Sequence, residues 1–153
     1  MSMSLILVPI AIAIFVTASE TADQISNERV LSNKRGIEGI QTKYVSAELL
    51  KQTLIEHGVS TEIISENCII ADFLEGRIEY YRMSLNDPFK MNISNIQDAE
   101  AVICNVRMIE AEYHSNVQTY SYNRLIKNLP DNMSIETEEI LEDNSILITL
   151  SVD

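Results

Sequence analysis

The chain has few glycines, few prolines and few basic residues, and each shortage excludes a class of protein. Four glycines and three prolines in 153 residues argue against collagen-like, linker-rich and low-complexity sequences. Eleven basic residues against 23 acidic ones give a net charge of −12. This argues against a general nucleic-acid binder, because such proteins neutralise phosphates with lysine and arginine. The body is expected to repel DNA, RNA and anionic lipid head groups, so its partner is expected to be a protein.

The sequence also lacks the residue patterns that mark familiar catalytic sites. It contains no glycine-rich phosphate loop, no His-Glu-x-x-His, no Cys-x-x-Cys and no Ser-His-Asp arrangement. We therefore predict a protein that is not an enzyme, with no catalytic residue, no cofactor and no metal. An enzyme without a recognisable motif is the alternative.

Isolated histidines and cysteines do not change this prediction. His57 ends a predicted helix, where the dipole favours a cation. His114 follows Glu110 by four residues on a second predicted helix, but two potential ligands do not make a metal site. Cys68 and Cys104 are predicted to be buried free thiols, with a disulfide as the alternative.

An apolar fraction of 46% predicts a folded chain, and its length suits one domain with a modest core. Residues 1–19 carry no charge and are predicted to form an apolar helix. Nineteen helical residues span about 28 Å, close to the hydrocarbon thickness of a bilayer. Three interpretations remain open: a membrane helix, a cleaved secretory signal, and a helix buried against a partner subunit.

The basic residues nearest to this segment predict its orientation. None precedes it, whereas Arg29, Lys34 and Arg35 follow it. By the positive-inside rule, a spanning helix would leave the rest of the chain in the cytoplasm. The prediction is a membrane-associated protein with a cytoplasmic domain. The alternatives are a cytoplasmic protein held in a complex and a secreted one.

The remaining residues predict an α+β fold. Residues 20–38 are predicted to be a polar helix or linker, and residues 39–153 an α+β domain. An antiparallel sheet is predicted to be packed by one short and one long helix. The short helix is expected over 46–58, with Ser46 as its N-cap, and the long one over 98–128. Strands are expected at 39–45, 61–65, 67–74, 77–83, 89–93, 133–140 and 146–152, the last two as a hairpin.

The long helix shows a stripe of apolar residues in steps of three and four. This stripe is predicted to face the core and consists of Val102, Val106, Ile109, Tyr113, Val117, Tyr120 and then Leu125 or Ile126.

Acidic residues gather at the end of the chain. Residues 131–153 contain seven acids and no lysine or arginine. In the predicted hairpin, an edge strand would offer unpaired backbone groups beside steering charges. We therefore predict a protein-contact region made of Glu136, Glu138, Glu139, Glu142 and Asp143. The alternative is that these acids only protect an exposed edge from aggregation.

The stretch from Glu112 to Leu150 resembles an uncharacterised family of small α+β proteins found in cyanobacteria, red-algal plastids and clostridia. In that family, a helix with a Gln-x-x-Tyr element precedes a Glu-Glu, Asp-(Gly/Asn)-Ser-Ile hairpin. The matching residues here are Gln118, Tyr122 (shifted by one position), Glu138, Glu139, Asp143, Ser145 and Ile146. The family's aspartate-aromatic segment is missing and the apolar N-terminus is an addition. The family is thought to work beside ring-forming ATPases, but the resemblance supports only the fold.

These observations predict a non-enzymatic acidic subunit or adaptor, tethered by its N-terminal apolar helix to a membrane or a larger protein assembly. Its partners are expected to be proteins, in a homo- or hetero-oligomer. The main alternative is a secreted acidic binding domain.

Overall fold

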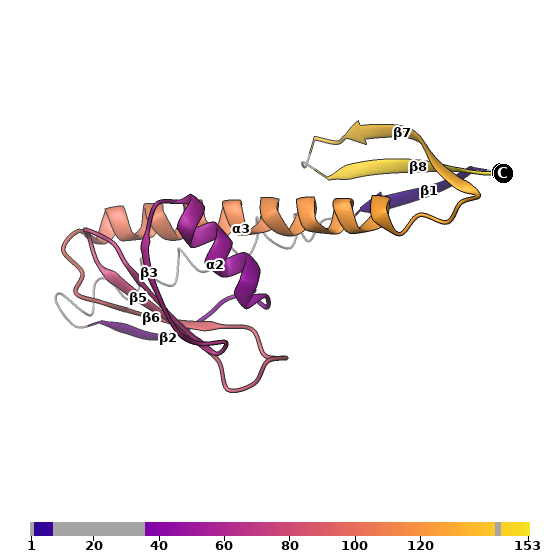
Figure 1. Ribbon diagram of the computed structural model, residues 1–153. Helices are drawn as coiled ribbons and strands as arrows, with labels where there is room; N and C mark the ends of the chain where they lie inside the picture. Colours follow the sequence, from indigo (N-terminus) through magenta and orange to yellow (C-terminus); the bar gives the residue numbers. More distant parts are fainter. Residues whose placement is uncertain (1, 8–35, 143–144) are drawn as a thin grey trace. The chain divides into compact units, whose positions relative to one another are not determined.

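The fold is α+β, as predicted, and its described residues fall into two compact units (Figure 1). The computed structural model describes residues 2–7, 36–142 and 145–153. One unit contains residues 36–113, and the other contains residues 2–7 with the described residues of 114–153. The long helix α3 (Ala99–Lys127) contributes residues to both units. The predicted boundaries after residues 19 and 38 remain predictions.

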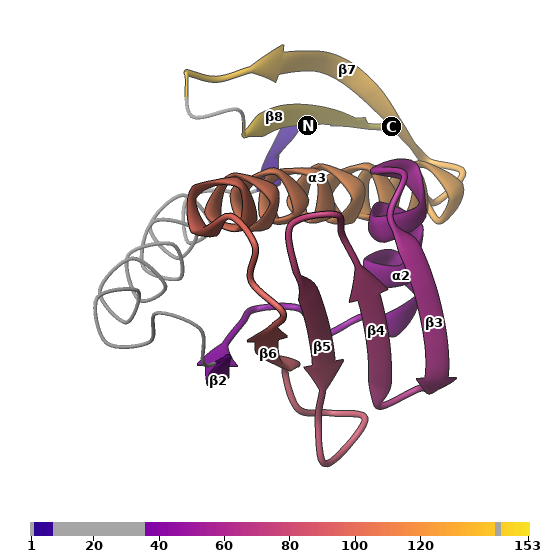
Figure 2. The ribbon, with the colours of Figure 1, turned by 90° about the vertical axis from the view of Figure 1, so that its left-hand side faces the viewer.

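The larger unit contains a five-stranded antiparallel sheet in the order β2-β6-β5-β4-β3 (Figure 2). Strands β3 to β6 follow one another as a meander, and β2 pairs with β6, so β2 and β3 are the edges. The strands are β2 (Ile37–Gln41), β3 (Ser60–Ser65), β4 (Cys68–Asp72), β5 (Arg77–Tyr81) and β6 (Lys90–Ser94).

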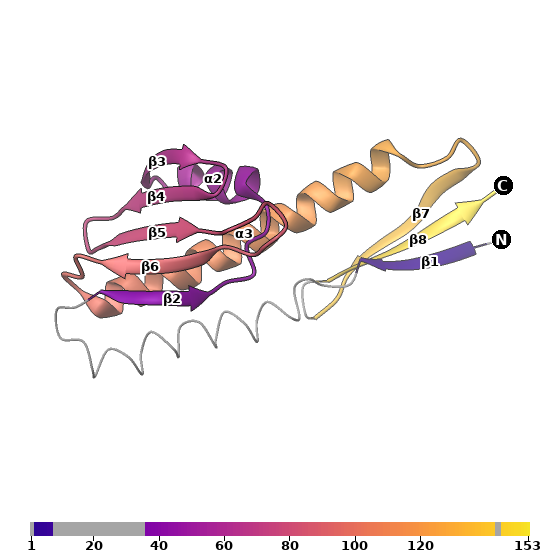
Figure 3. The ribbon, with the colours of Figure 1, turned by 90° about the horizontal axis from the view of Figure 1, so that it is seen from below.

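Alternation of apolar and polar residues gives this sheet one buried face. Ile69, Tyr80 and Met91 lie opposite one another on adjacent strands, and all three are buried. Helix α2 (Ala47–Glu56) and the first part of α3 lie on one side of the sheet (Figure 3). The core of this unit therefore lies between the two helices and the sheet.

Capping residues fix where both helices begin, as the sequence predicts for the first. The Ser46 side chain accepts a hydrogen bond from the backbone N–H of Leu49, and Asp98 does the same for Glu100 and Ala101.

The prediction of the buried stripe on α3 is confirmed at its first four positions, Val102, Val106, Ile109 and Tyr113. It is wrong for Tyr120, which is 55% exposed.

The smaller unit contains a three-stranded antiparallel sheet in the order β1-β8-β7. The predicted C-terminal hairpin is confirmed with its predicted bounds, β7 (Met133–Ile140) and β8 (Ile146–Val152). Strand β8 lies in the centre, and its Ile148 and Leu150 are buried. Strand β7 is therefore an edge of this sheet.

At the start of the predicted N-terminal helix, Ser2–Leu7 form strand β1 and pair with β8, and the helix itself stays a prediction. The uninterrupted apolar run begins only at Leu5, whereas Ser2 and Ser4 alternate with Met3 and Leu5 as in a strand. Strand β8 supplies the hydrogen-bonding partner. The rest of the predicted helix, residues 8–19, lies outside the described residues. Within the described part of the chain, no helix is long and apolar enough to cross a membrane.

The cysteine prediction is partly wrong. Both thiols are free, but Cys104 is exposed on α3 and Cys68 is half-buried on β4. Cys104 lies between the buried Ile103 and the half-buried Asn105, on the side of the helix that faces away from the core.

Candidate functional site

Three of the five predicted acidic residues lie on β7, which is an edge strand among the described residues. Glu136, Glu138 and Glu139 are exposed on β7, and Glu142 is exposed just beyond it. Asp143 lies outside the described residues. The structure does not bring these acids onto one surface, because successive side chains of a strand point to opposite faces. Glu138 lies opposite Ile148 and Glu139 opposite Leu147.

Glu138 lies on the face of the hairpin that is turned toward α3. The Tyr122 hydroxyl of α3 donates a hydrogen bond to Oε1 of Glu138. This bond, with smaller contributions from burial and from the Glu138 charge, raises the pKa of Tyr122. On the same face, Ile148 and Leu150 are buried, so Glu138 interrupts an otherwise apolar row.

A groove of about 390 Å³ lies beside this hydrogen bond. Helix α3 contributes three side chains, and the end of the hairpin contributes three more; the lining residues are Gln118, Thr119, Tyr122, Glu138, Ile140 and Ile146. Ile140 is 74% exposed and lies opposite another apolar residue, Ile146. The arrangement can hold an apolar chain that ends in a positive charge.

Sequence reasoning did not find this groove. Glu138 was predicted as one acid of a charged hairpin and also appeared in the family resemblance, whereas Gln118 and Tyr122 entered only through that resemblance. The sequence places Ile140 at the end of a predicted strand but does not show that its side chain is exposed. Ile140 lines a groove only because side chains of α3 lie beside it.

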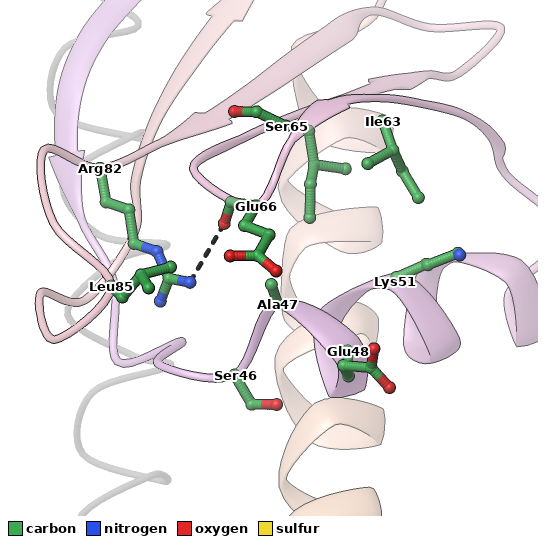
Figure 4. Close-up of a pocket in the computed structure, with 10 residues that line it drawn as sticks. Ser46, Ala47, Glu48, Lys51, Ile63, Ser65, Glu66, Arg82 and Leu85 are labelled. Atoms are coloured by element: carbon green, nitrogen blue, oxygen red, sulfur yellow. Dashed lines mark hydrogen bonds between the residues drawn. The ribbon is translucent and has the colours of Figure 1, made fainter.

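A second pocket, of about 350 Å³, lies in the larger unit at the start of α2 (Figure 4). Its lining carries side chains of both signs, Glu48, Glu66, Lys51 and Arg82, together with apolar ones such as Ile63. No single ligand charge is favoured by such a mixture.

The buried charge in this pocket, Arg82, is engaged by the protein itself. Its guanidinium donates to Oδ1 of Asn67 at 3.0 Å and to three backbone carbonyl oxygens, those of Val45 (2.7 Å), Glu66 (3.1 Å) and Asp87 (3.5 Å). It also lies 4.3 Å from the centre of the Phe89 ring. Arg82 therefore joins three connecting segments, and we interpret it as a structural residue.

The buried tyrosines of the larger unit form part of its core. Tyr44 lies 5.9 Å from Tyr80 and 4.7 Å from Tyr113, measured between ring centres. Burial and the nearby Glu110 raise the pKa values of Tyr44 and Tyr80. The Tyr113 hydroxyl accepts hydrogen bonds from the backbone N–H groups of Val45 and Ser46. These contacts connect α3 to the start of α2.

The two histidines lie in different surroundings. Nδ1 of His57, the C-cap of α2, lies 3.4 Å from Oε1 of Glu112. His114 is buried on α3. In the described part of the chain, no group of three or more potential ligands is placed to hold a metal ion.

His114 is expected to make the protein less stable in mild acid. Burial lowers its pKa from 6.5 to about 4, so the unfolded chain binds a proton that the folded chain excludes. Stability is full above about pH 6.5 and falls as the pH decreases toward 4, by about 2 kcal/mol at pH 5. Urea unfolding at pH 7.5 and pH 5 should show this loss in the wild-type protein. The loss should be smaller by that amount in His114→Gln. An equal loss in both proteins would contradict the assignment of this acid sensitivity to His114.

Comparison with known proteins gives no family for this chain. No family model matches it, and no significantly similar protein was found among curated proteins or solved structures. The resemblance of residues 112–150 to the cyanobacterial, plastid and clostridial family therefore remains a prediction.

Proposed function

We propose that the protein is a non-enzymatic acidic subunit or adaptor that binds another protein through strand β7. The observation that carries the proposal is that β7 is an exposed sheet edge with acidic side chains along it. An edge strand presents unpaired N–H and C=O groups to an approaching chain, and the absence of lysine and arginine from residues 131–153 gives this edge one sign of charge.

Two features of the structure favour this surface over the pocket at Arg82. The pocket has lining charges of both signs, and its buried guanidinium already binds four oxygen acceptors. The β7 edge, in contrast, is open along most of its length, since residues 136–140 are all exposed.

The pairing of β1 with β8 changes how the N-terminus enters the proposal. Ser2–Leu7 take part in the sheet that carries β7, so they contribute to the chain's own fold. We therefore propose attachment to a larger protein assembly through β7. A membrane tether formed by residues 8–19 is the second possibility, and a secreted binding domain is the third.

Capture of partners from a lysate of the natural host tests the proposal. Tagged wild-type protein is compared with a variant in which Glu136, Glu138, Glu139 and Glu142 are all replaced by Gln. A matched control carries the same change of charge on the larger unit, at the exposed residues Glu38, Glu48, Glu62 and Glu66. We expect the hairpin variant to lose a specific partner at low salt, where charges are least screened, and the control variant to retain it. Retention by both variants would overturn the proposal.

A further inference from the structure

The groove between the hairpin and α3 indicates what kind of side chain a partner of β7 presents. Its walls are apolar, from Ile140 and Ile146, and one carboxylate, that of Glu138, lies among them. Such a lining matches the side chain of lysine or arginine, whose aliphatic stem packs on apolar surface while its charged end reaches a polar group.

Tyr122 positions the carboxylate for this purpose. Its hydroxyl donates to Oε1 of Glu138, and Tyr122 and Glu138 both line the groove. A carboxylate has two oxygens and several acceptor positions, so one donor leaves Oε2 available for a cation. The bond also holds Glu138 on the face turned toward α3.

The free edge of β7 is next to the groove. An added antiparallel or parallel strand would lie about 4.8 Å from β7, with alternate side chains on the same face as Glu138 and Ile140. One of these side chains would reach the groove while the backbone of the added strand forms hydrogen bonds with β7. The negative charge of the β7 edge favours a basic segment, because residues 131–153 contain no lysine or arginine. The acids in question are Glu136, Glu138, Glu139 and Glu142.

We propose that β7 binds an extended basic segment of the partner protein, and that one lysine or arginine of this segment occupies the groove. Its stem contacts Ile140 and Ile146, and its charged end binds Glu138. This inference rests on the proposed function, and it adds the chemistry of the partner and the residues that recognise it.

A short synthetic peptide in which lysine and valine alternate is the probe. It is titrated into the isotope-labelled full chain, and amide chemical shifts are followed by NMR. As a strand, this peptide places every lysine on one face. The comparison peptide has the same composition with its lysines grouped at one end. We expect the largest shifts in β7, and tighter binding of the alternating peptide.

Two variants at adjacent positions distinguish specific binding in the groove from non-specific attraction to an acidic strand. Glu138→Gln and Glu139→Gln remove the same charge from adjacent residues of β7, but the two side chains lie on opposite faces. At about 0.15 M ionic strength, where exposed charges are screened, Glu138→Gln should weaken peptide binding about tenfold, as expected for loss of a charge-assisted contact. Glu139→Gln should weaken it less than about threefold. Ile140→Ser should weaken it as well, without altering the amide spectrum of β8.

The outcomes distinguish this inference from the proposed function. Equal weakening by Glu138→Gln and Glu139→Gln would show diffuse attraction only and would overturn the groove. Absence of shifts in β7, or larger shifts in another edge strand such as β3, would also overturn it. In either case the proposed function would still stand if the fourfold hairpin variant loses its partner in the capture experiment, and it would fail separately if that variant keeps it.

Discussion

Replacing Arg82 with methionine is expected to lower the free energy of unfolding of the larger unit by about 3–5 kcal/mol. Methionine keeps part of the aliphatic stem but removes every donor. The carbonyl oxygens of Val45, Glu66 and Asp87 then lose a charged partner in a place where the Arg82 side chain is only 8% exposed. The contact with the Phe89 ring is also lost.

Arg77→Met is the matched control for this prediction. Arg77 is the first residue of β5, whereas Arg82 follows its last residue. The ion pair of Arg77 with Asp72, at 3.5 Å, is formed by side chains that are 40% and 51% exposed. Its loss should cost less than about 1 kcal/mol. Hydrogen exchange of the amides of β4 and β5 measures both changes within the larger unit. A cost for Arg82→Met no greater than that for Arg77→Met would contradict the structural role of Arg82.

Replacing Val106 with aspartate is expected to have an effect of similar size, at least about 4 kcal/mol. Val106 is 1% exposed on the stripe of α3 that faces the core. An aspartate there would either bury an unpaired charge or take up a proton at a free-energy cost. Thermal unfolding followed by far-ultraviolet circular dichroism measures the loss.

Cys104→Asp is the control for Val106→Asp. Cys104 is exposed on the same helix, so an aspartate there should change stability by no more than about 0.5 kcal/mol. Asn105 is less suitable, because its side-chain amide lies 3.4 Å from a carboxylate oxygen of Glu75, and an aspartate would repel that group. Similar losses at positions 104 and 106 would show that the buried face of α3 is wrongly assigned.

Much of the fold was predictable because it depends on local patterns. The steps of three and four from Val102 to Tyr113 predicted the buried face of α3, and the alternation in residues 146–152 predicted β8 with its observed bounds. Ser46 was predictable as a cap because its side chain acts only three residues away.

Features that depend on distant residues were not predictable in this way. Strand β1 required its pairing with β8, nearly the whole chain away. Arg82 had a faint signal, since it continues the buried alternation of Ile78 and Tyr80, but its acceptors come from three separate segments. Likewise, the candidate site was predictable as an acidic edge, whereas the groove required the Tyr122 hydroxyl of α3 to reach Glu138 of the hairpin.

Site-specific photo-crosslinking tests most directly whether β7 is the surface that binds a partner. A photoreactive amino acid is placed at Thr137 on the exposed edge β7 and, in a separate protein, at Glu62 on the exposed edge β3. After irradiation in the natural host, we expect a discrete crosslinked protein from position 137 and none from position 62. The adduct should disappear when Glu136, Glu138, Glu139 and Glu142 are replaced by Gln. A discrete adduct from position 62 with none from position 137 would contradict the assignment of β7 as the binding surface.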